Sequence, residues 1–557
     1  MQSEPAVKKW VNENVAKRYG LVWERHAEGT REEIDRNVLP VLEHDEKRSI
    51  TGDGGPDNIL IEGDNYHALQ ILNYTHRGRI DVIYIDPPYN TGARDWKYNN
   101  DYVDGNDAYR HSKWLSFMEN RLRIAKTLLK RTGSLIIAVD DYEVNQLGLL
   151  LEKLFPSWTR DLIVVVHHPQ GTGSKTVSRV HEYAYVVTPA GSEFGGRERI
   201  RGENNWSLQR AGQGENNWRK HRPNSFFAIH VDKGTGRVTG VGPRIPGGQK
   251  RYPKTSPGDP FRRIYPIDRD GNERVWRYVR KTMMEKIKNG EIRSTRNGTL
   301  VVVRGQKTKP VTSVWDDAIY NAGTHGSGLL TEIMGVSNTF SYPKSLYTVR
   351  DMLQMIIRYD RDAVVLDFFA GSGTTGHAVL EMNGEDGGSR RFILCTNNEN
   401  DICTGVCHPR ISRVIRGYRD KSGGMVEGLG SSLRYFRIDP RMRRHMDRRK
   451  ITQKIAAMLC VKESCFIAVR RAVNKYAIFK DQDGRHFGIV YAPDDVDGYL
   501  EAVRGLKRPK KTGRRPVYTY AFAHDRIIPS KLRKSPLVHT RVVPAPILNL
   551  WDRWFER

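Results

Sequence analysis

The sequence lacks the features of a secreted or membrane protein. Its 557 residues include only 5 cysteines, and their spacing does not form a disulfide framework, which is typical of a reducing cytoplasm. It contains no run of about 20 apolar residues, which a membrane span would require. The stretch from Met1 to Lys9 is polar, unlike a signal peptide. We therefore expect a cytoplasmic protein without a membrane partner.

Signals for a metal site and for ATP-driven movement are missing too. Cys403, Cys407 and His408 have a loose metal-like spacing, but no C-x2-C pair is present, and we interpret these cysteines as ordinary partly buried thiols. The chain has no P-loop of the form G-x4-G-K-[ST]. We expect no metal in the site, and any ATP-driven step would need a separate partner.

What the sequence has in excess is positive charge. Lys and Arg number 91 against 64 Asp and Glu, which gives a net charge of +27. A compact enzyme for neutral substrates does not need such an excess. It suits a polyanion, because each Lys or Arg that neutralises a phosphate releases condensed counterions. Nucleic acid is therefore the expected partner.

Short apolar runs alternate with segments of helical periodicity. The runs cover residues 59–63, 80–85, 134–139, 362–367 and 391–396. Apolar runs of this kind are expected of parallel strands that are covered on both faces. Strands that alternate with helices predict an open parallel α/β sheet. The alternation breaks down between about 160 and 335, where we expect a small irregular domain.

The tetrapeptide Asp86-Pro87-Pro88-Tyr89 follows one of these strands directly. Open α/β sheets place their sites at the carboxyl ends of parallel strands. Asp86 can accept from an exocyclic amine, and the prolines fix the backbone. Tyr89 offers a flat face on which an extruded base can stack, as chemistry on a base within a duplex requires. The pattern predicts a catalytic turn, and the alternative is a turn that merely ends a strand.

A glycine-rich turn follows a second strand. It begins at Asp367 and contains Gly371, Gly373 and Gly376 in a G-x-G-x-x-G pattern, which lets backbone approach a nucleotide-like ligand closely. The acidic residue and two aromatics that open the turn favour a cationic sulfonium and an adenine ring. A dinucleotide-binding oxidoreductase is the rival interpretation, and a tight turn without a ligand is the other.

Together the two motifs resemble the amino-methyltransferase family that acts on DNA. Their order, with the tetrapeptide first and the glycine turn about 280 residues later, resembles the beta class of that family. Further segments resemble modification subunits of type III restriction systems: 61–69, 114–141, 313–315, 321–324 and 340–344. The resemblance covers roughly residues 55–190 and 310–440. It implies S-adenosyl-L-methionine as cofactor and an α/β, Rossmann-like S-adenosylmethionine-dependent methyltransferase core in circularly permuted motif order.

The resemblance also implies roles for individual residues. The catalytic residues would be Asp86, Pro87, Pro88 and Tyr89. The cofactor would be held by Phe340, Pro343, Lys344, Asp367, Phe369, Gly371, Gly373, Thr374 and Glu399. The sequence departs from the family pattern at the end of the second cofactor strand, where many members carry an acidic residue for the ribose hydroxyls; here the strand ends Thr396-Asn397-Asn398-Glu399, and Glu399 could serve. Thr396 or Asn397 could contact the ribose in its place.

From the motifs and the changes in composition we expect five regions. They are an N-terminal helical extension (1–55), the catalytic half of the core (56–160), an inserted target-recognition region (161–335), the cofactor-binding half (336–430) and a basic α+β C-terminal domain (431–557). Trp206, Trp218, Phe226 and Phe227 could form a DNA-contacting surface or the core of the inserted region. The basic segments 437–450 and 507–515 could track phosphates or could be solvated faces.

The expected activity is methyl transfer to the N6 amine of a flipped adenine in double-stranded DNA. The chain would be the modification component of a restriction or phage-defence system, with a second copy of itself and a separate restriction or translocase subunit as partners. An aspartate at the start of the tetrapeptide favours adenine by resemblance. Three alternatives stay open: an N4-cytosine DNA methyltransferase, an RNA methyltransferase, and a catalytically silent DNA-recognition subunit.

Overall fold

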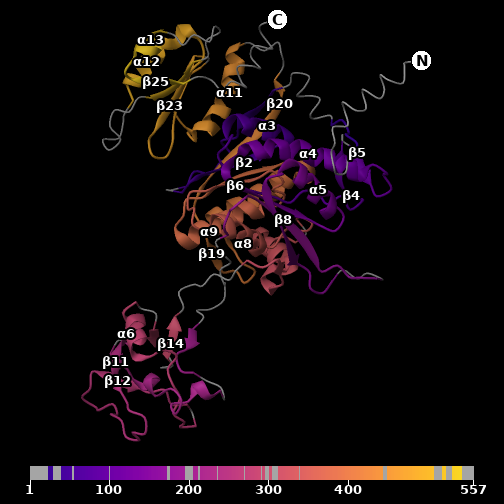
Figure 1. Cartoon of the computed structure of the whole chain (residues 1–557). Helices are drawn as coiled ribbons and strands as arrows, with labels where there is room; N and C mark the ends of the chain where they lie inside the picture. Colours follow the sequence, from indigo (N-terminus) through magenta and orange to yellow (C-terminus); the bar gives the residue numbers. More distant parts are fainter. Residues whose placement is uncertain are drawn as a thin grey trace, which may run out of the picture. The chain divides into compact units, whose positions relative to one another are not determined.

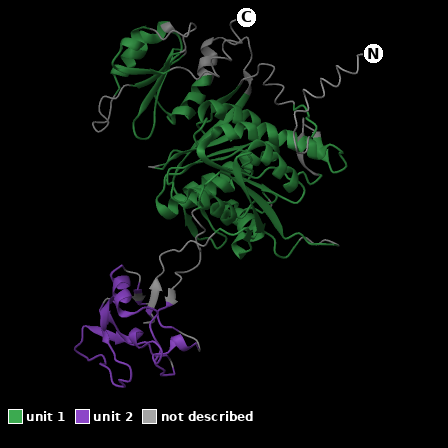
Figure 2. Ribbon diagram, viewed as in Figure 1, with its two compact units in different colours: residues 1–195, 311–557 green, residues 196–310 purple. Residues whose placement is uncertain are grey.

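The computed structural model contains a large α/β unit and a second, smaller compact unit (Figures 1 and 2). The large unit is formed by residues 1–195 and 311–557, and the smaller one by residues 196–310. The structure describes residues 23–28, 39–52, 55–98, 101–171, 176–194, 205–210, 214–234, 236–268, 270–289, 292–294, 300–303, 311–337, 339–442, 448–473, 475–506, 517–521 and 530–541.

A mixed sheet forms the centre of the large unit. In the described part of the chain it has ten strands, in the order β1 (Leu39–His44), β20 (Ser432–Met442), β2 (Asp57–Glu62), β17 (Arg391–Thr396), β16 (Val364–Asp367), β3 (Ile80–Ile85), β6 (Leu129–Val139), β8 (His181–Pro189), β7 (Trp158–Val166) and β15 (Val314–Trp315). The six strands from β20 to β6 are parallel to one another. Their carboxyl ends therefore meet at one edge.

Helices cover both faces of the sheet, as its residue pattern requires. Successive strand residues point to opposite faces, so Ile59 and Ile61 join one apolar core and Leu60 joins the other. Such strands must be apolar throughout. The first core includes α3 (Asn65–Thr75), α4 (Arg110–Leu128), α5 (Val144–Leu154) and α11 (Arg448–Glu463), and the second includes α8 (Leu346–Ile357), α9 (Thr374–Asp386) and α10 (His408–Arg416) (Figure 1). Within the described chain, no helix has the length and apolar character to cross a membrane.

The sheet differs from the expected parallel one at both sides. Strand β8 runs antiparallel to β6 and to β7, and β1 runs antiparallel to β20. Residues 39–44, which we expected to be part of a helical extension, form strand β1 because their backbone pairs with β20. Most of the remaining N-terminal extension lies outside the described residues.

The smaller unit is narrower than the inserted region 161–335 that the sequence suggested. Strands β7, β8 and β15 fall within that region but belong to the main sheet. The unit contains a sheet of β10 (Phe227–Asp232), β11 (Val238–Arg244) and β12 (Phe261–Ile264), a sheet of β9 (Asn205–Ser207), β13 (Ile292–Ser294) and β14 (Leu300–Val303), and helix α6 (Arg280–Lys288). Phe226 and Phe227 are fully buried, so they stabilise this unit and do not form a contact surface.

The C-terminal region has a sheet of its own. Its strands are β21 (Ile467–Ala472), β22 (Tyr476–Lys480), β23 (His486–Val490), β24 (Val517–Ala521) and β25 (Val538–Arg541), with α12 (Val496–Arg504) and α13 (Ser530–Lys534) beside them. Strand β20 joins the main sheet, although it falls within the region 431–557 that we expected to be a separate domain. The basic segment 507–515 lies outside the described residues.

Candidate active site

The two sequence motifs follow neighbouring strands of the main sheet. Asp86 comes directly after β3, and Asp367 is the last residue of β16. These strands pair in parallel, with Leu366 opposite Ile83. The strand order reverses between them, since β17 and β2 follow on one side and β6 on the other. Open α/β sheets bind ligands at such a switch point, outside the carboxyl ends of the strands.

The turn that contains the tetrapeptide is held by groups from two helical segments. Trp114 of α4 donates from its indole nitrogen to the carbonyl of Pro88 at 2.7 Å. The next residue after the tetrapeptide, Asn90, has a left-handed backbone with φ of 58°, and its amide donates to the buried Glu143 carboxylate at 2.5 Å. His111 of α4 lies 2.7 Å from the same Glu143 oxygen. The turn is therefore fixed on both sides of Tyr89.

Glu143 lies at the start of α5 and is fully buried. Burial raises the pKa of its carboxyl to about 8, although the hydrogen bond from Asn90 opposes this rise. Burial also raises the pKa of Asp140, which follows β6 at the same edge of the sheet, to about 6. The edge thus carries several carboxyl groups that bind protons more tightly than they would in water.

An ammonium group lies between two carboxylates at the tetrapeptide. The Lys344 amine lies 3.4 Å from the Asp86 carboxylate, and it donates to the Glu182 carboxylate and the Tyr89 hydroxyl. The Tyr89 hydroxyl donates to Glu182 at 3.2 Å. Lys344 also lies 4.7 Å from the centre of the Tyr89 ring. Four polar side chains from three distant segments therefore form one cluster.

The charges of this cluster depend on one another. Burial raises the pKa of Asp86; Lys344 opposes that rise and Glu182 adds to it. Burial would also raise the pKa of Glu182, but Lys344 and His167 bring it below its ordinary value. Burial would lower the pKa of Lys344, yet the two carboxylates hold it above its ordinary value. Lys344 and Glu182 are thus charged, and Asp86 is the carboxylate that is more easily protonated.

The glycine turn is ordered by its own aspartate. The Asp367 carboxylate accepts from the Phe369 backbone N–H at 2.9 Å and from the Thr375 hydroxyl at 2.5 Å. Burial raises its pKa to about 7. Both carboxylate oxygens therefore hold the turn, and a direct contact of Asp367 with the cofactor stays a prediction.

Glycine is required in the turn for conformation and for space. Gly371 and Gly373 have φ of 47° and 81°, in the left-handed region that other residues rarely adopt. A Cβ on Gly371 would lie 3.1 Å from the Phe340 ring, and a Cβ on Gly373 would lie 3.1 Å from the Cys407 sulfur. Phe340 thus packs directly on the turn, while Cys407 packs behind it.

A buried arginine supports the same turn from α10. Arg410 is 0% exposed, and its guanidinium donates to the hydroxyls of Ser372 at 3.1 Å and Thr374 at 2.8 Å. Burial lowers its pKa to about 10. Hydrogen bonds between a buried charge and two hydroxyls keep the turn in one conformation. No local pattern in the sequence pointed to this arginine, because its partners lie 36 and 38 residues away.

The segment 340–344 bridges the two motifs. Phe340 contacts the glycine turn, whereas Lys344, four residues later, contacts the tetrapeptide, and Pro343 between them is buried. Glu399 lies in a short helical turn after β17, at the same edge of the sheet. The roles of all these residues in binding or catalysis stay predictions.

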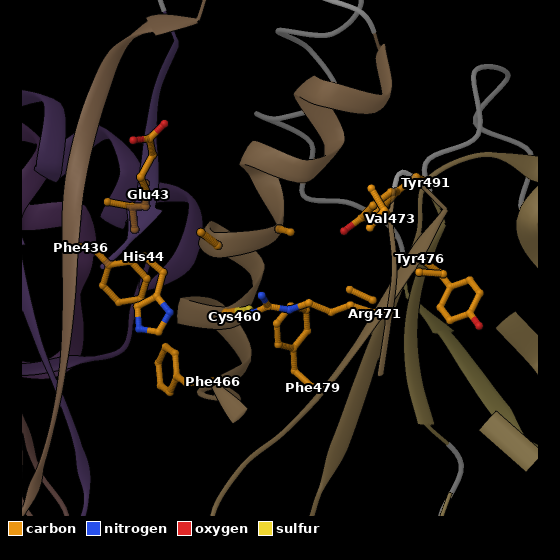
Figure 3. A pocket seen from close by; sticks show the side chains of 15 residues that line it. Glu43, His44, Phe436, Cys460, Phe466, Arg471, Val473, Tyr476, Phe479 and Tyr491 are labelled. Carbon is orange, nitrogen blue, oxygen red and sulfur yellow. The ribbon is translucent and has the colours of Figure 1, made fainter. Parts of the chain in front are cut away.

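A cavity is present at another place in the large unit (Figure 3). It has a volume of about 390 Å³ and is bounded by β1 and β20 on one side, α11, and β21 and β22 on the other. Figure 3 shows His44 and Phe436 across from Phe479, with Cys460 of α11 between them. None of the described residues that line it belongs to the cluster around Asp86. The cavity is therefore separate from the candidate active site.

Comparison with known proteins supports the family resemblance. A family model described as DNA methylase matches residues 80–404, a range that includes both motifs. The type II methyltransferase M.KpnI of Klebsiella pneumoniae is 31% identical over 380 residues, which cover 65% of this chain and 86% of the relative. The StyLTI Mod subunit of a type III restriction-modification enzyme of Salmonella typhimurium (strain LT2) is 29% identical over 393 residues, and the chain spans 55% of its length.

Among solved structures, the PvuII DNA methyltransferase, described as cytosine-N4-specific, covers 73% of this chain with 9% identity and a TM-score of 0.32. The match spans 94% of that chain.

Proposed function

The chain belongs to the N6/N4 DNA methylase family, and on that premise we propose that it transfers a methyl group from S-adenosyl-L-methionine to the N6 amine of a flipped adenine in double-stranded DNA. The observation that carries this proposal is the meeting of the two motifs. Asp86 and Tyr89 follow one strand, and the glycine turn follows the strand beside it. A methyl acceptor held by the first would face a methyl donor held by the second.

The residues of the glycine turn fit this cofactor. A Cβ on Gly371 would contact the Phe340 ring, so the turn offers bare backbone next to an aromatic side chain, which suits a nucleoside-like ligand. Phe369 and Thr374 lie beside the same turn, and Asp367 holds its shape. Glu399, or Thr396 or Asn397, would reach the ribose. When bound, the cofactor supplies a methyl group activated by a positively charged sulfur.

The tetrapeptide would prepare the amine for attack. An adenine amine is a poor nucleophile, because its lone pair is delocalised into the ring. Asp86 and a carbonyl that the prolines leave free can accept its two N–H groups as the nitrogen becomes tetrahedral. Tyr89 would stack on the extruded base. The Asp86 carboxylate would then accept the proton that the methylated nitrogen loses.

The charge of the smaller unit supports DNA as the substrate. Residues 196–310 contain 27 Lys and Arg against 10 Asp and Glu, so this unit carries +17 of the net charge of +27. This excess is concentrated in about a fifth of the chain. Contacts with phosphates would position the duplex, and other groups of the unit would read the base sequence. We propose that the smaller unit recognises the target site.

The named relatives favour a role in restriction and modification. M.KpnI is a type II methyltransferase, and the StyLTI relative is a Mod subunit of a type III restriction-modification enzyme. We propose that this chain is the modification component of such a system and pairs with a second copy and with a separate restriction or translocase subunit. The N4 amine of cytosine is the second candidate acceptor, because it offers the same two N–H donors.

The proposal can be tested in cells. DNA from a methylase-free strain that expresses the chain is sequenced by a single-molecule method that detects modified bases. We expect one short sequence context with a modified adenine, and no such context in cells that express Asp86→Ala. Unmodified DNA in both strains, with the protein present and folded, would contradict the proposal.

A further inference from the structure

A carboxylate of β8, two strands away from β3 in the sheet, contacts the tetrapeptide but has no role in the proposed reaction so far. Glu182 lies near the start of β8, which runs antiparallel to β6. Because of this direction, the start of β8 reaches the edge at which the parallel strands end. The residue that follows, Tyr183, pairs with Val139, the last residue of β6. Glu182 is thus placed beside the active site by the topology of the sheet.

Its position in the strand is one that normally holds an apolar residue. Along β8 every second side chain points to the same face, and Ala184 and Val186, which share the face of Glu182, are buried in an apolar core. The Glu182 side chain is only 7% exposed. An ionised carboxylate at such a position costs free energy unless it is paired, and even a paired charge seldom stabilises a fold. Stability alone therefore does not account for it.

Glu182 contacts the two groups that also contact Asp86. Its carboxylate accepts hydrogen bonds from the Lys344 amine and the Tyr89 hydroxyl. Lys344 lies closer to Glu182 than to Asp86, whose carboxylate it approaches to 3.4 Å. If Glu182 were neutral, the attraction of Asp86 for the ammonium would have no competitor. The ammonium would then occupy the carboxylate oxygens that an amine must use.

We propose that Glu182 is a positioning residue for methyl transfer, which holds Lys344 and the Tyr89 hydroxyl so that the Asp86 carboxylate stays available to the target amine. This inference rests on the proposed function. Glu182 itself touches neither base nor cofactor in this scheme. It acts through its hydrogen bonds to Lys344 and Tyr89.

The electrostatic consequence has a definite sign. The charges of Lys344 and Glu182 and the Tyr89 hydroxyl act on Asp86, and Asp367 on β16 lies close enough for its carboxylate to interact with it. Asp140 after β6 and His167 after β7 interact electrostatically with Lys344. Glu182 raises the pKa of Asp86, and Lys344 lowers it. Glu182→Gln removes the first effect and strengthens the second. The pKa of Asp86 therefore falls in this variant.

The test compares Glu182→Gln with Glu152→Gln, a change at an exposed carboxylate of α5. Methyl transfer to DNA and binding of cofactor and DNA are measured from pH 5 to 9. For Glu182→Gln we expect kcat to fall at least about tenfold, the two dissociation constants to stay within about twofold, and the acidic limb of kcat/KM to move to lower pH. An unchanged rate and pH profile, or a loss of rate without a shift of the acidic limb, would overturn the proposal.

A second measurement does not depend on activity. In a crystal structure of Glu182→Gln, the distance between the Lys344 amine and the Asp86 carboxylate is expected to shorten from 3.4 Å to that of a direct ion pair, about 2.8 Å. An unchanged distance would contradict the inference whatever the protein methylates. Failure of the proposed function is recognised separately, because the wild-type chain would then transfer no methyl group to DNA.

Discussion

Lys344 donates a hydrogen bond to the hydroxyl of Tyr89, although 255 residues separate them in the chain. The segment between them includes the whole smaller unit. Lys344 belongs to the segment that packs on the glycine turn, and Tyr89 belongs to the tetrapeptide. This contact therefore joins the proposed acceptor site to the proposed cofactor site.

Asp86→Ala should abolish methyl transfer and leave DNA binding intact. Asp86 acts on the amine, whereas affinity comes mostly from phosphate contacts spread over the protein. We expect kcat to fall at least about a hundredfold in assays with tritiated cofactor, while gel-shift affinity changes little. Asp161→Ala, at an exposed position of β7, is the matched control. Loss of both activities together would mean that Asp86 is structural.

Gly371→Val should weaken cofactor binding by more than about tenfold, because the side chain would collide with the Phe340 ring and occupy the space of the ligand. Gly78→Val is the control, since Gly78 also has a left-handed φ of 65°, but a Cβ added there would meet no atom within 4 Å. Calorimetry with the cofactor measures both. Equal effects of the two variants would show that only backbone strain matters at Gly371.

Lys344→Met should move the acidic limb of kcat/KM to higher pH. Lys344 lowers the pKa of Asp86, and Glu182 raises it, so removal of the ammonium leaves two like charges facing each other. The direction is opposite to that expected for Glu182→Gln. Lys47→Met, at an exposed position, should leave the profile unchanged. A shift of Lys344→Met to lower pH would refute the assignment of these charges.

Glu143→Gln should flatten the pH dependence of stability. The folded-state pKa of Glu143, about 8, lies above its ordinary value of 4.5, so its contribution to stability is full below about pH 4.5 and is lost as the pH rises toward 8. From pH 5.5 to 8 we expect the free energy of unfolding to fall by about 1–3 kcal/mol less in the variant than in the wild type. Urea unfolding at both pH values measures this, with Glu152→Gln as control. Equal losses would disprove the prediction.

The sequence predicted the parts of the site that are local. An aspartate and two prolines after an apolar run, or glycines after another, can be recognised without knowledge of the fold. The family resemblance based on these motifs is confirmed by the match to residues 80–404. The meeting of the two motifs then follows from the parallel order of β16 and β3.

The rest of the site depends on distant neighbours. Glu182 lies in a strand that the sequence analysis assigned to the inserted region, and only the sheet brings it beside β6. A charged residue at an inward position of an alternating strand was the one available signal. Arg410 had none, since any helix may carry an arginine, and its burial under the glycine turn arises from the packing of α10. For Phe226 and Phe227 the sequence left surface and core open, and only the packing of the smaller unit shows that they belong to its core.

The central claim is tested most directly by the chemical identity of the product. Purified chain is incubated with S-adenosyl-L-methionine and unmethylated duplex DNA, and the DNA is digested to nucleosides for mass spectrometry. The account predicts N6-methyladenine, and none of it with Asp86→Ala. N4-methylcytosine alone would overturn the choice of base, and DNA without any methylated nucleoside would contradict the proposed function itself.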